Sequence, residues 1–129
     1  MNESALHILV VDDDMMARMT AGQCVKQAGH TAAMAEGGVR AIEMLHSDKY
    51  DLVLLDLMMP DMDGFEVLRQ IKENPQLKDL PVIMVSGADE AESIAKCIQM
   101  GAAAHLAKPL DSMRLTNLIA ECMAKLTPT

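Results

Sequence analysis

Two groups of aspartates stand where short apolar runs of the sequence end. Asp12, Asp13 and Asp14 follow the run at 8–11, and Asp56 follows the run at 52–55. In a parallel sheet the ends of two neighbouring strands lie side by side, so we expect these carboxylates to share one cleft. Crowded carboxylates raise one another's pKa or bind a cation, and oxygen ligands suit a hard ion. The pattern predicts a Mg²⁺ site in which Asp56 could be both ligand and nucleophile.

Short apolar runs alternate with helical patterns along the whole chain. The apolar runs predict five strands, at 6–11, 31–35, 51–55, 81–85 and 103–106, with five helices between and after them. The first helix should stop near Gly29, and Asp111 could cap the last one. Such alternation indicates an α/β fold with a doubly wound parallel sheet and right-handed crossovers. Ligands of these folds bind beyond the carboxyl ends of the strands, where the strand order reverses.

Two further polar residues are expected at the same edge of the sheet. The fourth predicted strand is followed by Ser86, and the fifth leads to Lys108 and Pro109. An acyl phosphate on Asp56 would need a metal, a hydroxyl donor and a cation around its oxygens, because phosphoryl transfer depends on positioning and charge stabilisation. Ser86, Lys108 and the metal would supply these three.

Length and composition favour one globular domain. The 129 residues, 50% of them hydrophobic, suit a single domain over 1–129 with loose termini at 1–5 and 127–129. No apolar run approaches the roughly 20 residues that span a bilayer, and the first residues lack the pattern of a secretory signal. We therefore expect a cytoplasmic protein without a membrane segment.

Charge and residue usage exclude some functions. A net charge of -8 argues against direct contact with nucleic acid, which requires a basic face. Cys24, Cys97 and Cys122 are odd in number and lie in helical patterns, as reduced core thiols do. Because Tyr50 and Phe65 are the only aromatic residues beside 13 methionines, methionine and aliphatic side chains should fill the core.

Several segments together resemble the receiver domain of response regulators in two-component signalling. The resemblance covers nearly the whole chain and rests on five pieces in order: 8–14 (ILVVDDD), 50–56 (YDLVLLD), 59–64 (MPDMDG), 85–87 (VSG), and Gly101-Ala102 leading to Lys108-Pro109. It implies a flavodoxin-like sheet of five strands in the order 2-1-3-4-5 with five helices. It also implies a signalling protein rather than an enzyme.

The resemblance assigns roles to the polar residues. Asp56 would accept a phosphoryl group from a histidine kinase or a histidine phosphotransfer protein. Mg²⁺ would be held directly by Asp13, by Asp56 and by the backbone carbonyl of Met58, while Asp12 would act mainly through water. Lys108, expected before a cis proline bond, would pair with the acyl phosphate, and Ser86 would swing toward it. Asp14 lies outside the family's acidic pair and is expected to cap a helix.

The resemblance also implies how the signal leaves the domain. The surface of helix four, strand five and helix five would change, act on a downstream protein or on an output domain absent from this chain, and could form a homodimer through helices four and five. The absence of an attached output domain favours a stand-alone module, and a receiver from a larger regulator stays an equal alternative.

Three positions depart from or vary within the family. Met58 and Ala88 stand two residues after the acceptor and the hydroxyl, where the family tunes hydrolysis of the phosphoryl group, and neither side chain can hydrogen-bond a water. His105 stands where the family usually has Tyr or Phe. It either fills the space of the ring or titrates near neutral pH, so that protonation favours its outward orientation.

Other functions fit the sequence less well. A flavin-binding carrier needs a hydroxyl- and glycine-rich phosphate loop after the first strand, where Asp12 to Asp14 would repel phosphate. A hydrolase with an aspartate nucleophile needs an acid at the place of Met58. An EF-hand register with Gly64 at its sixth position puts Met59 and Gln70 at ligand positions, which excludes it. A pseudo-receiver that binds partners without accepting phosphate is left as the alternative.

Overall fold

The computed structural model describes residues 5–87 and 89–126. Strands and helices alternate along these residues, as the sequence predicts. They are β1 (His7–Val11), α1 (Met15–Gln27), β2 (Thr31–Ala35), α2 (Gly38–Ser47), β3 (Leu52–Asp56), α3 (Gly64–Glu73), β4 (Val82–Ser86), α4 (Ala91–Met100), β5 (Ala104–Ala107) and α5 (Ser112–Leu126). The strands are parallel and lie in the order β2-β1-β3-β4-β5, which confirms the predicted α/β fold and its strand order.

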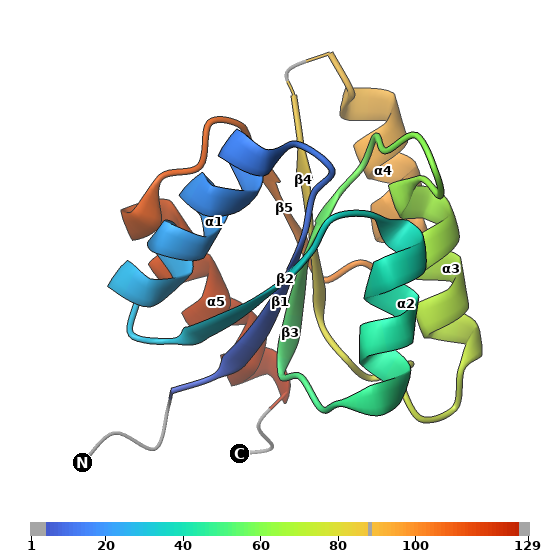
Figure 1. Ribbon diagram of the computed structural model, residues 1–129, viewed down its shortest axis with the longest axis horizontal. Helices are drawn as coiled ribbons and strands as arrows, with labels where there is room; N and C mark the ends of the chain where they lie inside the picture. Colours follow the sequence, from blue (N-terminus) through green and yellow to red (C-terminus); the bar gives the residue numbers. More distant parts are fainter. Residues whose placement is uncertain (1–4, 88, 127–129) are drawn as a thin grey trace.

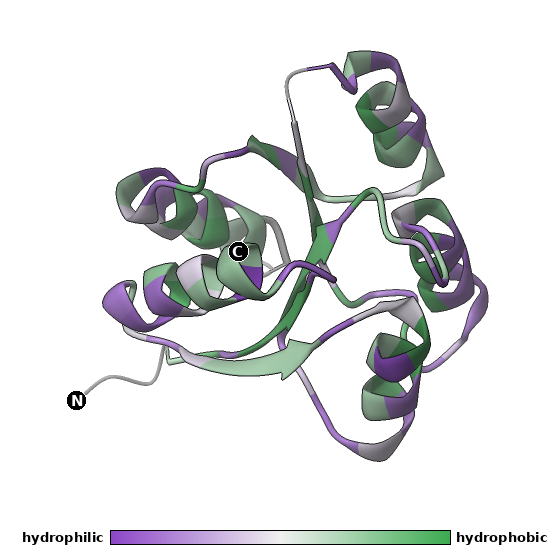
Figure 2. Cartoon of the chain, turned by 45° about the horizontal axis from the view of Figure 1, so that its top comes forward, coloured by the Kyte–Doolittle hydropathy of each residue, from purple (hydrophilic) through white to green (hydrophobic). Residues whose placement is uncertain are grey.

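Helices cover both faces of the sheet. α1 and α5 lie on one face, and α2, α3 and α4 lie on the other (Figure 1). Neighbouring residues of a strand point to opposite faces, so Ile8 and Val10 pack with α1 and α5, whereas Leu9 and Val11 pack with the other three helices. Because both faces are covered, the central strands are hydrophobic except for one polar residue at an end of each (Figure 2).

The last three strands each begin and end one residue later than predicted. Asp56 and Ser86 are consequently the final residues of β3 and β4, and not the first residues of the following loops. The parallel ladder continues to this point, with Asp56 opposite Val85 and Ser86 opposite Ala107. Backbone pairing within the sheet therefore holds these two polar residues in place.

The helix ends follow the predicted capping residues. The side chain of Asp14 accepts a hydrogen bond from the Ala17 N–H at 2.8 Å and caps the start of α1. α1 ends at Gln27, just before Gly29, whose φ of 93° is easily adopted by glycine. Asp111 accepts from the N–H of Met113 at 3.1 Å at the start of α5.

The residues that fill the core differ partly from expectation. Cys24, Cys97 and Cys122 are buried free thiols, as predicted. Met59 and Met84 are also buried, but aliphatic side chains make up most of the core. Five other methionines are between 60% and 71% exposed: Met15, Met16, Met19, Met58 and Met113. The expectation that methionine fills the core is only partly confirmed.

Within the described part of the chain, no helix is both long and apolar enough to cross a membrane. The loose termini expected at 1–5 and 127–129 lie outside the described residues, except for residue 5, which is exposed and belongs to no strand or helix.

Candidate functional site

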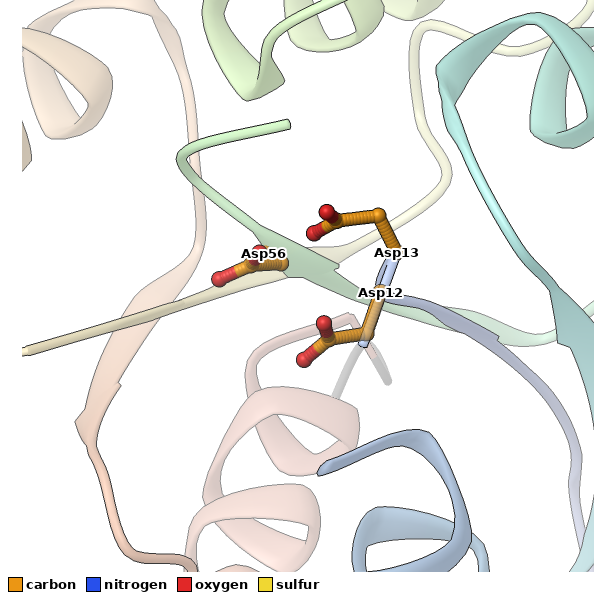
Figure 3. Close-up of side chains that lie close together, drawn as sticks. All are labelled: Asp12, Asp13 and Asp56. Atoms are coloured by element: carbon orange, nitrogen blue, oxygen red, sulfur yellow. The ribbon is translucent and has the colours of Figure 1, made fainter. Parts of the chain in front are cut away.

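Three aspartates meet at the carboxyl edge of the sheet. Asp12 and Asp13 directly follow β1, and Asp56 ends the neighbouring strand β3. The chain turns in opposite directions from these two strands, so this is the point where strand order reverses. One oxygen of each carboxylate lies within 4.8 Å of the others (Figure 3). The structure thus brings together the three carboxylates that the sequence placed at one edge.

The environment of Asp56 disfavours its charged form. Asp12 and Asp56 are each only 5% exposed, whereas Asp13 is open to solvent. Burial raises the pKa of Asp56 to about 6; the hydrogen bond from Lys108 opposes this rise, and the charge of Asp12 adds to it. A cation bound among these carboxylates would relieve the repulsion.

Lys108 contacts two of the three carboxylates. Its Nζ lies 2.9 Å from Oδ1 of Asp56 and 3.4 Å from Oδ2 of Asp12. Burial alone would lower the pKa of Lys108, but the hydrogen bond and the charges of Asp56 and Asp12 raise it overall. The bond to Pro109 is cis, as expected, and the Lys108 N–H donates to the Ser86 carbonyl at 2.8 Å. The Lys108 ammonium is therefore one positive charge already in contact with the aspartate cluster.

Ser86 is hydrogen-bonded through its hydroxyl to a side chain of β5. It is 1% exposed, and its Oγ lies 3.1 Å from Nε2 of His105. His105 is an exposed residue of β5 that nevertheless reaches this buried hydroxyl with its ring. Both positions were singled out from the sequence, but their hydrogen bond was not predicted.

Two contacts that the sequence did not reveal support the loops of the site. Arg18 donates from its guanidinium to the backbone carbonyl of Asp12 at 2.9 Å. Asp61, in the loop after β3, accepts from the N–H groups of Gly38 and Val39 at 3.3 and 3.2 Å, at the start of α2. The helical position of Arg18, one turn after Asp14, is a weak local signal. Asp61 gives none, because its partners lie more than 20 residues away.

Gly64 lets α3 begin against the end of β3. A Cβ at this position would lie 2.7 Å from the carbonyl oxygen of Asp56 and 2.9 Å from Cα of Leu57. The Gly64 N–H donates to the Leu57 carbonyl at 2.7 Å, and Asp63 caps the helix by accepting from the N–H of Glu66 at 3.0 Å. This packing fixes the backbone that carries Asp56.

The structure says less about the two positions predicted to tune the lifetime of the phosphoryl group. Met58 is 60% exposed in the loop after Asp56. Ala88, predicted to tune the lifetime of the phosphoryl group, lies outside the described residues. The donor set of Asp12, Asp13 and Asp56 consists of carboxylate oxygens only, which fits a hard divalent cation such as Mg²⁺.

Comparison with known families agrees with this architecture. Residues 8–120 match the family model of the response regulator receiver domain. The chain therefore belongs to the receiver domain family of two-component response regulators, which are signalling proteins.

Relatives of this chain differ widely in length. It is 32% identical over 117 residues to the two-component response regulator ORR3 of Oryza sativa subsp. indica, covering 88% of this chain and 89% of that protein. A gliding motility regulatory protein of Myxococcus xanthus is 38% identical over 103 residues, which are 80% of this chain but 13% of that protein. The response regulator MprA of Mycobacterium ulcerans is 36% identical over a stretch that covers 97% of this chain and 52% of that protein.

Solved structures show the same fold. A putative response regulator from Chloroflexus aurantiacus superimposes with a TM-score of 0.88 at 23% identity, covering 94% of this chain and 99% of that one. NtrX from Brucella abortus gives a TM-score of 0.87 at 29% identity, over 94% of this chain and 27% of that one. The matched fold thus makes up 99% of one of these solved chains and 27% of the other.

Proposed function

We propose that this chain is a phosphorylation-activated switch of a two-component phosphorelay. Asp56 accepts a phosphoryl group from a phosphohistidine of a histidine kinase or a histidine phosphotransfer protein, in a Mg²⁺-dependent reaction. One observation carries the proposal: Asp56 is a buried carboxylate at a strand end, 2.9 Å from the Lys108 ammonium and grouped with two more carboxylates. The family match supports the class of reaction.

Asp56 acts as the nucleophile. One of its oxygens attacks the phosphorus; the new O–P bond forms as the P–N bond to the partner's imidazole breaks, and that nitrogen keeps the electron pair and takes up a proton. With a pKa of about 6, Asp56 is mostly ionised at neutral pH and can attack. The flexible Lys108 side chain needs only a short movement to pair with a phosphoryl oxygen.

The aspartate cluster would hold the metal ion. Asp13, Asp56 and the backbone carbonyl of Met58 would be direct ligands, and Asp12 would act through water. When bound, Mg²⁺ would neutralise charge on the transferred phosphoryl group. In its absence, the single positive charge of Lys108 is shared between Asp12 and Asp56 and offsets only part of their negative charge.

Phosphorylation would be reported through Ser86. Its Oγ must leave Nε2 of His105 to reach a phosphoryl oxygen, so the His105 ring loses a partner and the α4-β5-α5 surface changes. That surface would contact a downstream protein, an output domain or a second copy through α4 and α5. We propose that the protein performs this signalling role in the cytoplasm. It would make no direct contact with nucleic acid or membrane.

Phosphorylation by a small donor tests the function. Incubation with acetyl phosphate and MgCl₂ should add one phosphoryl group, measured by intact mass, and EDTA should prevent it. Asp56→Asn should remove the added mass, whereas Asp79→Asn, which removes an exposed carboxylate beyond α3, should not. Persistence of the modification in Asp56→Asn would place the acceptor elsewhere. No modification of the wild type by acetyl phosphate or by a phosphorylated phosphotransfer protein would favour the pseudo-receiver alternative.

A further inference from the structure

An open cavity lies beside the acidic cluster, on the face of the sheet that α1 and α5 cover. Its volume is about 380 Å³, and its floor is formed by Val10, Leu54 and Val85 of three neighbouring strands. Small-molecule sites typically have volumes of about 300–1,000 Å³ and mostly apolar walls with few polar groups. The cavity has this size and this kind of wall, and of its lining residues only Asp12, Asp56 and Lys108 belong to the proposed phosphoryl-transfer site.

Small side chains keep the cavity open. Ala17, Thr20 and Ala21 of α1 form one wall, and Pro109 and Leu110 of the loop between β5 and α5 form the opposite one. Larger side chains on this side of α1 would close the gap between helix and loop. Water in such a space finds few hydrogen-bond partners, so an apolar body that replaces it gains free energy.

The charges at the cavity's mouth select the kind of ligand. Asp12, Asp14 and Asp56 line it together with a single cation, Lys108. Lys108 is already bonded to Asp56 and Asp12, so an anionic ligand would have to compete with buried carboxylates for it. A ligand with a positive group meets uncompensated negative charge instead.

We propose that this cavity binds a small amphipathic cation, with an aromatic or alicyclic body against Val10, Leu54 and Val85 and one ammonium group at the carboxylates. Binding of this cation and of Mg²⁺ is mutually antagonistic, because both neutralise Asp12 and Asp56. The regulatory consequence rests on the proposed function: an occupied cavity slows phosphorylation of Asp56. The binding itself does not depend on that function.

Three related probes separate the contributions of body and charge. Amide shifts of the ¹⁵N-labelled protein are followed in EDTA with 2-phenylethylammonium, with 2-phenylethanol as its neutral counterpart, and with methylammonium as charge alone. We expect saturable shifts at Ala17, Thr20 and Leu110 with 2-phenylethylammonium and much weaker binding of the other two. Excess MgCl₂ should weaken binding of 2-phenylethylammonium by about fivefold or more, within the usual range of coupling between sites.

A cavity-filling variant tests the location. Ala17→Leu should abolish the shifts caused by 2-phenylethylammonium, and Thr20→Leu provides a second filling variant if the first fails to fold. Ala95→Leu makes the same change as Ala17→Leu on the exposed surface of α4 and should bind as the wild type does. The spectrum of each variant without probe shows whether its fold is intact.

Several results would overturn the proposal. These are the absence of saturable shifts, equal affinity for the neutral alcohol, equal shifts with methylammonium, binding unaffected by both leucine substitutions, or binding indifferent to Mg²⁺. Phosphorylation without any probe, followed by intact mass, tests the proposed function separately. A protein that binds the probe but accepts no phosphoryl group would contradict the function and leave the site established.

Discussion

The phosphoacceptor candidate destabilises the protein that carries it. Because the pKa of Asp56 rises from 3.8 unfolded to about 6 folded, the folded state takes up this proton first as pH falls. Binding of a proton by Asp56 therefore stabilises the folded state. This stabilisation is complete below the unfolded pKa and is lost as pH rises through about 6. At neutral pH and without metal, the ionised side chain therefore costs stability.

Asp56→Asn should stabilise the metal-free protein at neutral pH. We expect a gain in unfolding free energy of roughly 2 kcal/mol near pH 7.5, allowing for the lost partner of Lys108, and a much smaller gain near pH 4. Urea denaturation in EDTA at both values measures it, with Asp79→Asn as the control for loss of an exposed carboxylate. A gain that does not change with pH would show that burial of the charge is not its cause.

Met58 and Ala88 should make the phosphorylated form long-lived. Neither side chain can orient an attacking water by a hydrogen bond. The double variant Met58→Asn with Ala88→Glu should lose its phosphoryl group about ten times faster, the effect of roughly 1.4 kcal/mol on the barrier. Decay of the phosphorylated mass after removal of donor is the measurement, and Met19→Asn, at another exposed methionine, should decay as the wild type does. A double variant that decays no faster would contradict the idea.

At the scale of elements, the junction of β3 and α3 has no room for a side chain. Gly64→Ala would place a methyl group against the Asp56 carbonyl and the Leu57 backbone, which cannot move without disturbing the sheet. We expect a loss of about 1–3 kcal/mol in unfolding free energy and slower phosphorylation. Gly87→Ala, where the nearest contact would be Glu90 Oε1 at 3.8 Å, should be nearly neutral. Equal losses in both variants would mean that the contact at Gly64 is readily relieved.

The hydrogen bond between the side chains of Ser86 on β4 and His105 on β5 should respond to pH. Protonation leaves Nε2 of His105 able only to donate, so the Ser86 hydroxyl must act as acceptor. Lowering pH from about 8 to about 6 should shift the amides of Ser86 and β5 in the wild type, because protonation of the ring changes which group donates in this hydrogen bond. His105→Tyr should lose this response, and His46→Tyr, on the exposed side of α2, should keep it. Equal responses in wild type and His105→Tyr would show that His105 only fills space.

At the scale of the molecule, periodicity and chain order predicted most of the fold. Apolar runs located all five strands, even the alanine-rich β2. Strands of a sheet that is covered on both faces must be apolar along most of their length, so they are visible in the sequence. The last residues of β3, β4 and β5 were misplaced by one, because hydrogen bonding, not hydropathy, ends a strand. The cluster of Asp12, Asp13 and Asp56 was predictable because parallel strands bring their ends together. The roles of these residues and the extent of the domain stay predictions.

Contacts between distant segments were not predictable in the same way. Asp61 reaches α2, and Ser86 reaches His105, through geometry that only the folded sheet creates. The exposure of five methionines was also missed, because hydropathy cannot tell a core methionine from one at the surface. Side-chain direction on a helix depends on what packs against it.

The exposed methionines make the surface, and not the core, the target of oxidants. Thioethers in solvent are readily converted to polar sulfoxides, whereas buried ones are protected. Under mild peroxide, peptide mass mapping should show Met15, Met16, Met19, Met58 and Met113 oxidised well before Met59 and Met84. Equal rates for Met16 and Met84 would contradict this. Because Met16 lines the cavity and Met58 follows Asp56 by two residues, an oxidised chain would keep its fold but present a chemically different surface to any protein that approaches its acidic cluster.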